Sequence, residues 1–228
     1  MKFAAFCSGL LFLTIVNIPA TAQQYTDLLR SKDLSQWTLE NGGEVKSGWK
    51  LESDGSLHLA GRGGNLLSKE DFGDFDLWFE WKISAKGNSG IKYRVMQYGK
   101  SWLGPEYQIQ DDAAFPKMSA EHYTASLYDL VDQSQPIFSR RYLDLNEYSV
   151  GRVIVQRHRI RHWMNGNLVI DERDDSEHFA AAVKDSKFRG QEGFGRNHTG
   201  KLMLTDHGSE VWYRNIFIRR LDHCAVIP

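Results

Sequence analysis

Alternating hydrophobic and polar residues recur along most of the chain and predict a protein built almost entirely of β-strands. From residue 75 to residue 83 every odd position is apolar, while the even positions carry most of the charge. A strand with two such faces packs one of them on a core and turns the other toward solvent or a ligand. The same period predicts further strands at 91–96, 106–110, 125–131, 148–156, 159–164, 167–172, 201–206 and 211–221.

Turn signals separate these strands. Asn165-Gly166 predicts a hairpin between its two flanking strands, and Gly87-Asn88-Ser89-Gly90 predicts a turn after the strand at 75–83. No internal repeat and no low-complexity linker divides the chain. Short strands at regular spacing favour a sandwich over a barrel. The pattern therefore predicts one all-β domain, a two-sheet antiparallel β-sandwich of the jelly-roll type.

One segment, near residues 175–188, has the period of a helix. Asp174 and Glu177 have the spacing of a capping box. Behind them Phe179, Ala182 and Val183 form an apolar stripe. We expect one short amphipathic helix here, packed on the sandwich through that stripe.

The first 22 residues have the composition of a signal peptide. Lys2 supplies a positive charge, residues 3–16 form an apolar run, and Ala20-Thr21-Ala22 offers small residues for cleavage after Ala22. The run is short for a membrane span, and no later segment is apolar enough to provide one. We expect an exported protein, periplasmic or secreted, whose single mature domain comprises residues 23–228.

Cysteine content, charge and aromatic content narrow the function. Cleavage would remove Cys7 and leave Cys224, so the core rather than an internal disulfide must stabilise the domain. The formal net charge of −1 gives no sign of the basic face that nucleic acid binding requires. Seven Trp, nine Tyr and twelve Phe supply rings for the core and for stacking on a sugar. We expect a carbohydrate partner and no nucleic acid partner.

The polar faces of three consecutive strands carry candidate catalytic groups. Their charged and amide side chains are Glu80, Lys92, Arg94, Glu106, Gln108 and Gln110. If the three strands are neighbours, carboxylates and cations meet on one sheet face, as acid–base catalysis on a sugar requires. The alternative is a ladder of cross-strand ion pairs on a solvated sheet. Alternation alone leaves both interpretations open.

The histidines differ in their surroundings. His162 shares a strand face with Ile160 and Met164, which predicts a buried core histidine. His207 follows Asp206 where a strand gives way to a loop, a setting that suits proton transfer. No His-x-His or His-Glu-x-x-His spacing marks a dedicated zinc site. A metal held by scattered carboxylates and one histidine stays open.

A series of short motifs occurs in a fixed order along nearly the whole mature chain. These are Asp33-Leu34-Ser35-Gln36-Trp37, Phe72-Gly73-Asp74-Phe75-Asp76-Leu77, Asn88-Ser89-Gly90-Ile91, Gly104-Pro105-Glu106-Tyr107-Gln108-Ile109, Leu127-Tyr128, His162-Trp163-Met164-Asn165-Gly166, Ser186-Lys187-Phe188, Asp206-His207-Gly208 and Arg214-Asn215-Ile216. Together they resemble the 3-keto-disaccharide hydrolase family. The chain departs from that pattern at Thr205, where a Gln is expected, and at Ala125-Ser126, where a Gly-containing pair is expected.

The resemblance implies a concanavalin A-like lectin/glucanase fold and cleavage of glycosides oxidised to a ketone at C3. A C3 carbonyl acidifies the hydrogen on C2, so a base can remove it, and the enolate then expels the C1 substituent. Addition of water to the enone completes a net hydrolysis. The resemblance implies that Glu106 and His207 transfer protons and that Arg94 and Lys187 stabilise oxyanion charge.

The resemblance also implies groups that bind hydroxyls, orient the catalytic pair or hold a metal. These are Glu80, Asn88, Gln108, Asp111 and Tyr128. From its place at a strand end, Asp111 is expected to cap the following loop. A divalent metal ion is one candidate for the electrophile at the C3 oxygen, and no other cofactor is expected.

Three other classes of function stay open. A non-catalytic carbohydrate-binding module would stack Trp78, Trp102 or Trp163 on a sugar, although the charged strand faces argue against a pure binder. A conventional glycosidase would use two carboxylates on ordinary glycosides. A structural adhesion domain would show neither turnover nor a pocket.

Overall fold

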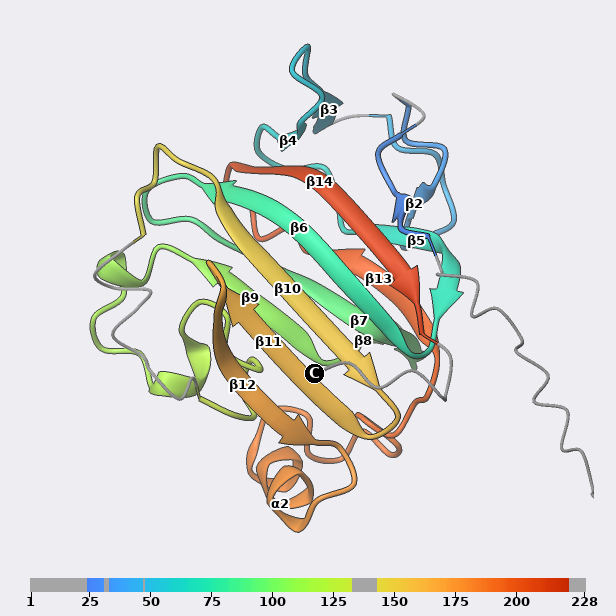
Figure 1. Cartoon of the computed structure of the whole chain (residues 1–228), viewed down its shortest axis with the longest axis vertical. Helices are drawn as coiled ribbons and strands as arrows, with labels where there is room; N and C mark the ends of the chain where they lie inside the picture. Colours follow the sequence, from blue (N-terminus) through green and yellow to red (C-terminus); the bar gives the residue numbers. More distant parts are fainter. Residues whose placement is uncertain (1–23, 31–32, 47, 133–142, 222–228) are drawn as a thin grey trace, which may run out of the picture.

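A computed structural model describes residues 24–30, 33–46, 48–132 and 143–221 of the chain. They form two antiparallel β-sheets packed face to face, with one α-helix at an end of the sandwich (Figure 1). The predicted all-β two-sheet sandwich is thereby confirmed. The predicted signal peptide and Cys224 lie outside the described residues. Within the described residues, no helix has the length and apolar character needed to cross a membrane.

The larger sheet forms the front layer of Figure 1. Its strands, in spatial order, are β12 (Asn167–Arg173), β11 (Arg159–Met164), β10 (Ser149–Gln156), β6 (Phe75–Ile83), β14 (Val211–Arg220), β4 (Leu57–Leu59) and β3 (Trp49–Leu51), with β1 (Thr26–Asp27) paired to β14. The predicted Asn165-Gly166 hairpin joins β11 to β12, and both residues have the positive φ that a tight turn requires.

The smaller sheet forms the rear layer. Its strands are β2 (Trp37–Leu39), β5 (Leu66–Phe72), β13 (Gly200–Leu204), β7 (Asn88–Tyr98) and β8 (Ser101–Leu103), with β9 (Glu106–Gln110) also paired to β7. The shorter 3-10 helices Asp112–Ala114 and Ala120–His122 follow β9. They lead into the segment that lies along the free side of β9.

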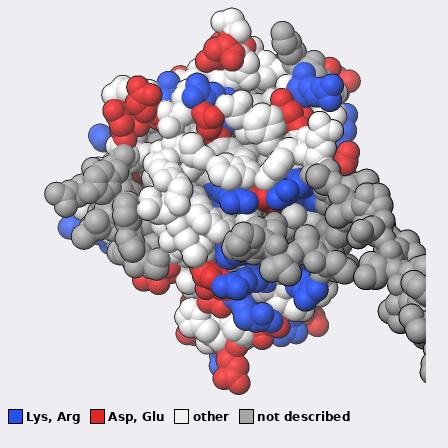
Figure 2. Space-filling model, viewed as in Figure 1, with Lys and Arg blue, Asp and Glu red and all other residues white. Residues whose placement is uncertain are grey.

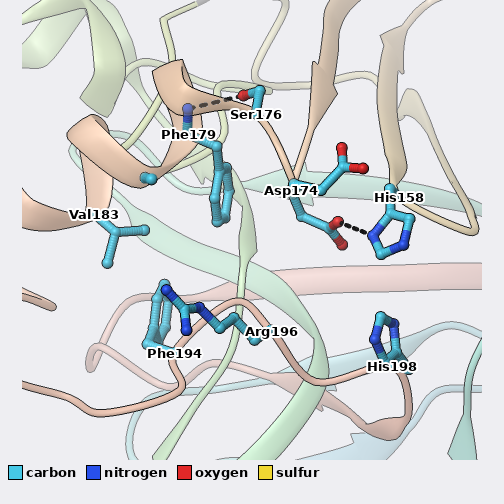
Figure 3. Close-up of a pocket in the computed structure, with 10 residues that line it drawn as sticks. His158, Asp174, Ser176, Phe179, Val183, Phe194, Arg196 and His198 are labelled. Carbon is cyan, nitrogen blue, oxygen red and sulfur yellow. Dashed lines mark hydrogen bonds and ion pairs between the residues drawn. The ribbon is translucent and has the colours of Figure 1, made fainter.

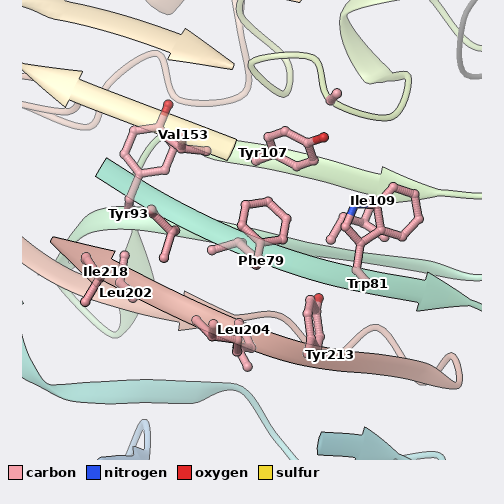
Figure 4. Close-up of a cluster of buried hydrophobic side chains, with 14 of the residues drawn as sticks. Phe79, Trp81, Tyr93, Tyr107, Ile109, Val153, Leu202, Leu204, Tyr213 and Ile218 are labelled. Carbon is pink, nitrogen blue, oxygen red and sulfur yellow. The ribbon is translucent and has the colours of Figure 1, made fainter. Parts of the chain in front are cut away.

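The core between the sheets is rich in aromatic rings (Figure 4). Phe79 of β6 meets Tyr107 of β9 nearly at right angles, with ring centroids 5.1 Å apart. His162 is fully buried here, 2.9 Å from the Tyr93 hydroxyl and 3.0 Å from the Ala125 carbonyl oxygen. Burial lowers the pKa of His162 to about 4, so the ring is neutral at pH 7. This confirms the predicted core histidine.

The segment predicted as a strand at 125–131 is not one. Its strand pairing is limited to the isolated bridges of Leu127 with Tyr107 and Val131. Ala125 and Asp129 have φ values of 66° and 62°, in the left-handed region that a strand does not allow. The chain therefore turns here and places Tyr128 beside Glu106, whose carbonyl oxygen accepts the Tyr128 N–H at 3.0 Å.

The predicted helix is α2 (Glu177–Asp185), which buries Phe179 against the core. Its N-cap is Ser176, whose hydroxyl accepts the Phe179 N–H at 2.9 Å. The predicted capping box that began at Asp174 is wrong. The Asp174 carboxylate instead binds His158 and Arg94, and so connects the start of the helix to the sheets.

Candidate active site

Pairing of β7 with β9 places a carboxylate and an ammonium group side by side on the outward face of the smaller sheet. Lys92 lies directly opposite Glu106 in the register, and Lys92 Nζ is 3.8 Å from Glu106 Oε2. Tyr107 and Ile109 point into the core, so Glu106 points away from it. Its side chain is 3% exposed, and Oε1 receives no hydrogen bond from the described residues. A buried carboxylate oxygen without a donor is costly, so its presence here calls for a functional explanation.

Gly90 makes room for this carboxylate. A Cβ atom built on Gly90 would lie 2.3 Å from Glu106 Oε1, well inside van der Waals contact. The backbone around Gly90 is fixed, because its carbonyl oxygen accepts the Thr205 N–H at 3.0 Å. Glu106 keeps its position only if residue 90 has no side chain.

Gly90→Ala is therefore expected to move the Glu106 carboxylate while the sheet stays intact. We expect kcat/KM to fall at least tenfold, since displacement of a catalytic group by about 1 Å costs up to about a hundredfold. Far-ultraviolet circular dichroism and kinetics on one preparation check this. Gly99→Ala, where a Cβ would meet open space, controls for glycine loss, although its φ of 61° adds local strain. Wild-type kinetics for Gly90→Ala would contradict the role of Glu106.

Three loops bring further groups to Glu106. His207 follows β13, Lys187 follows α2, and Tyr128 lies in the turn beside β9. Burial raises the pKa of Tyr128, and the negative charge of Glu106 raises it further. Burial lowers the pKa of Lys187 and of His207, and the charge of Glu106 partly offsets that lowering. The structure thus brings four of the predicted site residues together beside Lys92. These are Glu106, Tyr128, Lys187 and His207.

His207 is exposed to solvent. Loss of hydration on its protein side lowers its pKa below the usual 6.5, and the ammonium groups of Lys92 and Lys187 lower it further. At pH 7 the imidazole is therefore mostly neutral and able to accept a proton. The neighbouring Asp206 carboxylate fixes the loop rather than the ring, because its oxygens accept the N–H groups of Gly63, Gly64 and Gly208.

Lys187 is held by its backbone and its aromatic neighbour. Its N–H donates to Asp129 Oδ2 at 2.8 Å, and its Nζ lies 4.1 Å from the centroid of the Tyr128 ring. Its side chain meets solvent, yet the surrounding protein removes enough water to lower the pKa of Lys187. An ammonium group with a lowered pKa gives up its proton more readily than an ordinary lysine.

The amide side chains predicted to bind substrate line the same strands. Gln108 Nε2 donates to Asn88 Oδ1 at 3.2 Å, and Gln108 lies two residues along β9 from Glu106. Asp111 has a different role from the predicted cap. Its Oδ2 accepts the Lys86 N–H at 2.8 Å, and its side chain makes no capping bond to the helix that follows. Asp111 therefore fixes the β6–β7 turn.

Glu80 does not join this group. It lies on β6 of the larger sheet and points away from the core on the opposite side of the sandwich. Its carboxylate accepts hydrogen bonds from Arg214 Nε at 2.6 Å and Asn215 Nδ2 at 2.7 Å. The three strands with polar faces are consecutive in sequence but divide between two sheets, because β6 pairs with β10 and β14 rather than with β7.

Arg94 also lies outside the group. Its φ of 48° breaks the alternation of β7 and turns the side chain toward loops at the other end of the sandwich. There its guanidinium binds Asp74 at 3.0 Å and Asp174 at 3.1 Å, with its side chain 3% exposed. Lys92, which the sequence placed on the polar face but did not select, is the strand cation beside Glu106.

A separate cavity of about 420 Å³ lies beside α2 (Figure 3). His158, Asp174 and Asp175 on its wall are the one group of at least three His, Cys, Asp or Glu in the described residues that is close enough to share a metal. Both carboxylates are already held by arginines, Asp174 by Arg94 and Asp175 by Arg173. The cavity does not reach Glu106 or His207.

The Glu106 group does not fit a divalent metal ion. Beside one imidazole and two ammonium groups, Lys92 and Lys187, it offers the Glu106 carboxylate, while the nearby Asp129 and Asp206 already accept backbone N–H groups. Hard cations in protein sites require several oxygen ligands and a net negative surrounding. The ammonium groups themselves supply the positive charge that an oxyanion needs.

Comparison with known proteins agrees with this fold. The family model of a 3-keto-alpha-glucoside-1,2-lyase-like domain matches residues 24–219. The chain belongs to this family. Within the 3-keto-alpha-glucoside-1,2-lyase-like family it is similar to the 3-keto-disaccharide hydrolase of Bacteroides thetaiotaomicron, with 27% identity over 91% of this chain and 82% of that protein. The resemblance found in the sequence motifs is confirmed.

Two solved structures resemble this fold. A candidate glycosyl hydrolase from Parabacteroides distasonis superposes with a TM-score of 0.77 and 29% identity, over 87% of this chain and 94% of that one. A carbohydrate-binding module from Bacillus subtilis superposes with a TM-score of 0.50 and 14% identity, over 81% and 95% of the two chains. The second likeness concerns the fold alone.

Proposed function

We propose that this protein is an exported enzyme that cleaves 3-keto-glycosides by proton abstraction at C2, elimination and hydration. The observation that carries the proposal is the buried Glu106 carboxylate, whose Oε1 has no hydrogen-bond partner among the described residues, beside Lys92 and within electrostatic reach of His207 and Lys187. Family membership and the name of the Bacteroides relative support the substrate class.

In the first half of the reaction Glu106 takes the C2 proton. The electron pair moves to the C3 oxygen, where the Lys92 ammonium stabilises the enolate. Re-formation of the carbonyl creates a C1–C2 double bond and breaks the bond from C1 to the glycosidic oxygen. Lys187, with its lowered pKa, donates a proton to that departing oxygen.

In the second half a water molecule adds to C1 of the enone. Neutral His207 takes a proton from the water, and Glu106 returns its proton to C2. Transfer of the proton from His207 to Lys187 restores the starting state. The balance is one glycosidic bond and one water consumed and two hydroxyl groups formed, without a redox change.

A conventional two-carboxylate glycosidase fits the group less well. Such enzymes need a second carboxyl group about 5–10 Å from the first. Glu80, the other candidate from the sequence, lies on the opposite sheet. Asp129 and Asp206 are near enough to influence the group, but both accept hydrogen bonds from backbone N–H groups that fix the loops.

Turnover of matched substrates tests the proposal. Purified protein is incubated with a methyl glucoside and with its 3-keto derivative, and release of methanol is measured. Turnover of the keto substrate alone is expected. Turnover of both would favour the conventional glycosidase, and binding of either without turnover would favour a carbohydrate-binding module.

The rate should depend on pH in a bell-shaped manner. His207 must be neutral to accept a proton, so the rate falls as pH drops through its pKa, which lies below 6.5. Lys187 must be protonated to donate, so the rate falls as pH rises through its pKa, which lies below 10.5. Measuring kcat across this range checks both limbs. His207→Gln is expected to lose the acid limb, and an unchanged limb in that variant would assign it to another group.

A further inference from the structure

A second hollow lies on the outward face of the larger sheet, on the far side of the sandwich from Glu106. It has a volume of about 890 Å³ and is lined mainly by Gln24, Tyr25, Trp78, Glu80, Asn215 and Phe217. Figure 2 shows this face, where uncharged residues border a row of basic side chains. The size lies within the range of small-ligand sites in proteins.

Aromatic side chains form the floor of this hollow. Trp78 is 36% exposed, although a tryptophan side chain is usually mostly buried. Phe217 of β14 is its direct neighbour in the sheet register. On the other side Arg152 stacks over the Trp78 ring, 4.6 Å from its centroid. The two neighbours limit the rotation of the indole and leave part of its surface open.

A buried carboxylate that the proposed reaction does not use fixes these rings. Asp76 is fully buried although it points toward the solvent side of the sheet. It accepts hydrogen bonds from Arg152 and Arg219 at 2.8 Å and from the Tyr25 hydroxyl at 2.6 Å. Burial opposes its charge, but these donors outweigh burial and hold the pKa of Asp76 below its usual value. Arg219 in turn lies over the Tyr25 ring, 4.8 Å from its centroid.

Polar groups stand at the edge of the aromatic floor. β14 has a bulge between Arg214 and Phe217, and Asn215 within it has a φ of 53°. The bulge turns the Asn215 amide toward the sheet surface, where it donates to Glu80 Oε1. Each Glu80 oxygen accepts one hydrogen bond from the protein and retains a lone pair for a further donor.

We propose that this hollow is a second carbohydrate-binding site, which takes a neutral oligosaccharide that is not cleaved there. The apolar C–H face of a pyranose stacks on Trp78 and Phe217. Its hydroxyl groups donate to Glu80 and exchange hydrogen bonds with the amides of Asn215 and Gln24. The Trp78 ring is already held in place before a ligand binds, and a carboxylate and two amides lie beside it. This arrangement is complementary to a sugar, which has apolar C–H faces and hydroxyl groups around its edge. The site stands apart from the reaction at Glu106.

Calorimetric titration with unmodified cellotetraose and maltotetraose tests this site. Wild type, Trp78→Ala, Asn215→Gly, His207→Ala and Trp212→Ala are compared, each checked for its melting temperature. Asn215→Gly keeps the left-handed backbone and removes the amide. Trp212→Ala removes a tryptophan from the same face that stacks on His58 outside the hollow. We expect Trp78→Ala and Asn215→Gly to weaken binding at least tenfold and threefold, with His207→Ala and Trp212→Ala unchanged.

Several outcomes would overturn the second site. These are wild-type affinity in Trp78→Ala, loss of affinity in His207→Ala alone, and no binding of either probe by wild type. A concentration-dependent dimer that Trp78→Ala abolishes would assign this face to a second copy of the chain instead. Because the probes lack a keto group and binding needs no turnover, failure here leaves the proposed reaction at Glu106 untouched.

Discussion

Replacing Glu106 by glutamine is expected to lower kcat/KM on a 3-keto-glucoside by about 10²–10⁴-fold, the contribution typical of a general base. Glutamine keeps the shape of the side chain beside Gly90 but cannot take the C2 proton. The change also removes the negative charge beside Lys92, whose Nζ lies 3.8 Å from Glu106 Oε2. Steady-state kinetics with the keto substrate measure the loss.

A second measurement on the same variant does not depend on turnover. The charge of Glu106 raises the pKa of His207 against the effects that lower it, so Glu106→Gln should lower that pKa further. Titration of the His207 ring by NMR reports this shift. Glu70→Gln, an exposed carboxylate of β5 paired with Arg220, is the matched control and should leave both readouts unchanged. Near-wild-type kinetics for Glu106→Gln would exclude it as the base.

The sequence predicted most strands from residue 75 onward because alternation is a local property, but it missed the shorter strands before residue 75, where the alternation is weaker. The boundaries at 75–83 and 159–164 agree with β6 and β11, and Asn165-Gly166 marks the hairpin that follows. Alternation reports which side chains share a face of one strand, but it does not report which strands are neighbours. Glu80 was therefore grouped with Glu106, although the structure separates them by the full thickness of the sandwich.

The sequence suggested Arg94 rather than Lys92 as the cation near Glu106, and the structure places Lys92 there for a different physical reason. Strict alternation puts both side chains on one face, but a left-handed φ at Arg94 interrupts the strand between them. No propensity rule predicts an arginine in this conformation, since Asn, Asp and Gly are the residues that adopt it readily. The cost is offset by long-range contacts to Asp74 and Asp174, which a single sequence does not display.

Those contacts make Arg94→Ala the variant with the largest expected effect on stability. Arg94, Asp74 and Asp174 have side chains 3%, 7% and 4% exposed, so the change leaves two buried carboxylates without their arginine. The carbonyl oxygens of Gly73 and Arg157 also lose a donor, each at 3.2 Å. Breaking a buried pair from one side costs about 3–5 kcal/mol, and we expect this loss in the free energy of unfolding in urea.

The same variant separates a structural role for Arg94 from the catalytic role that the sequence suggested. Arg159→Ala removes an exposed arginine paired with Asp171 and should cost no more than about 1 kcal/mol, because water screens that pair. Below its melting temperature, folded Arg94→Ala should retain kcat/KM within a few-fold, since the guanidinium binds Asp74 and Asp174 rather than Glu106. Arg94→Lys, which keeps a charge, provides the comparison if alanine prevents folding. A hundredfold loss of kcat in either variant, with unfolding free energy unchanged, would return Arg94 to the catalytic group and contradict its placement.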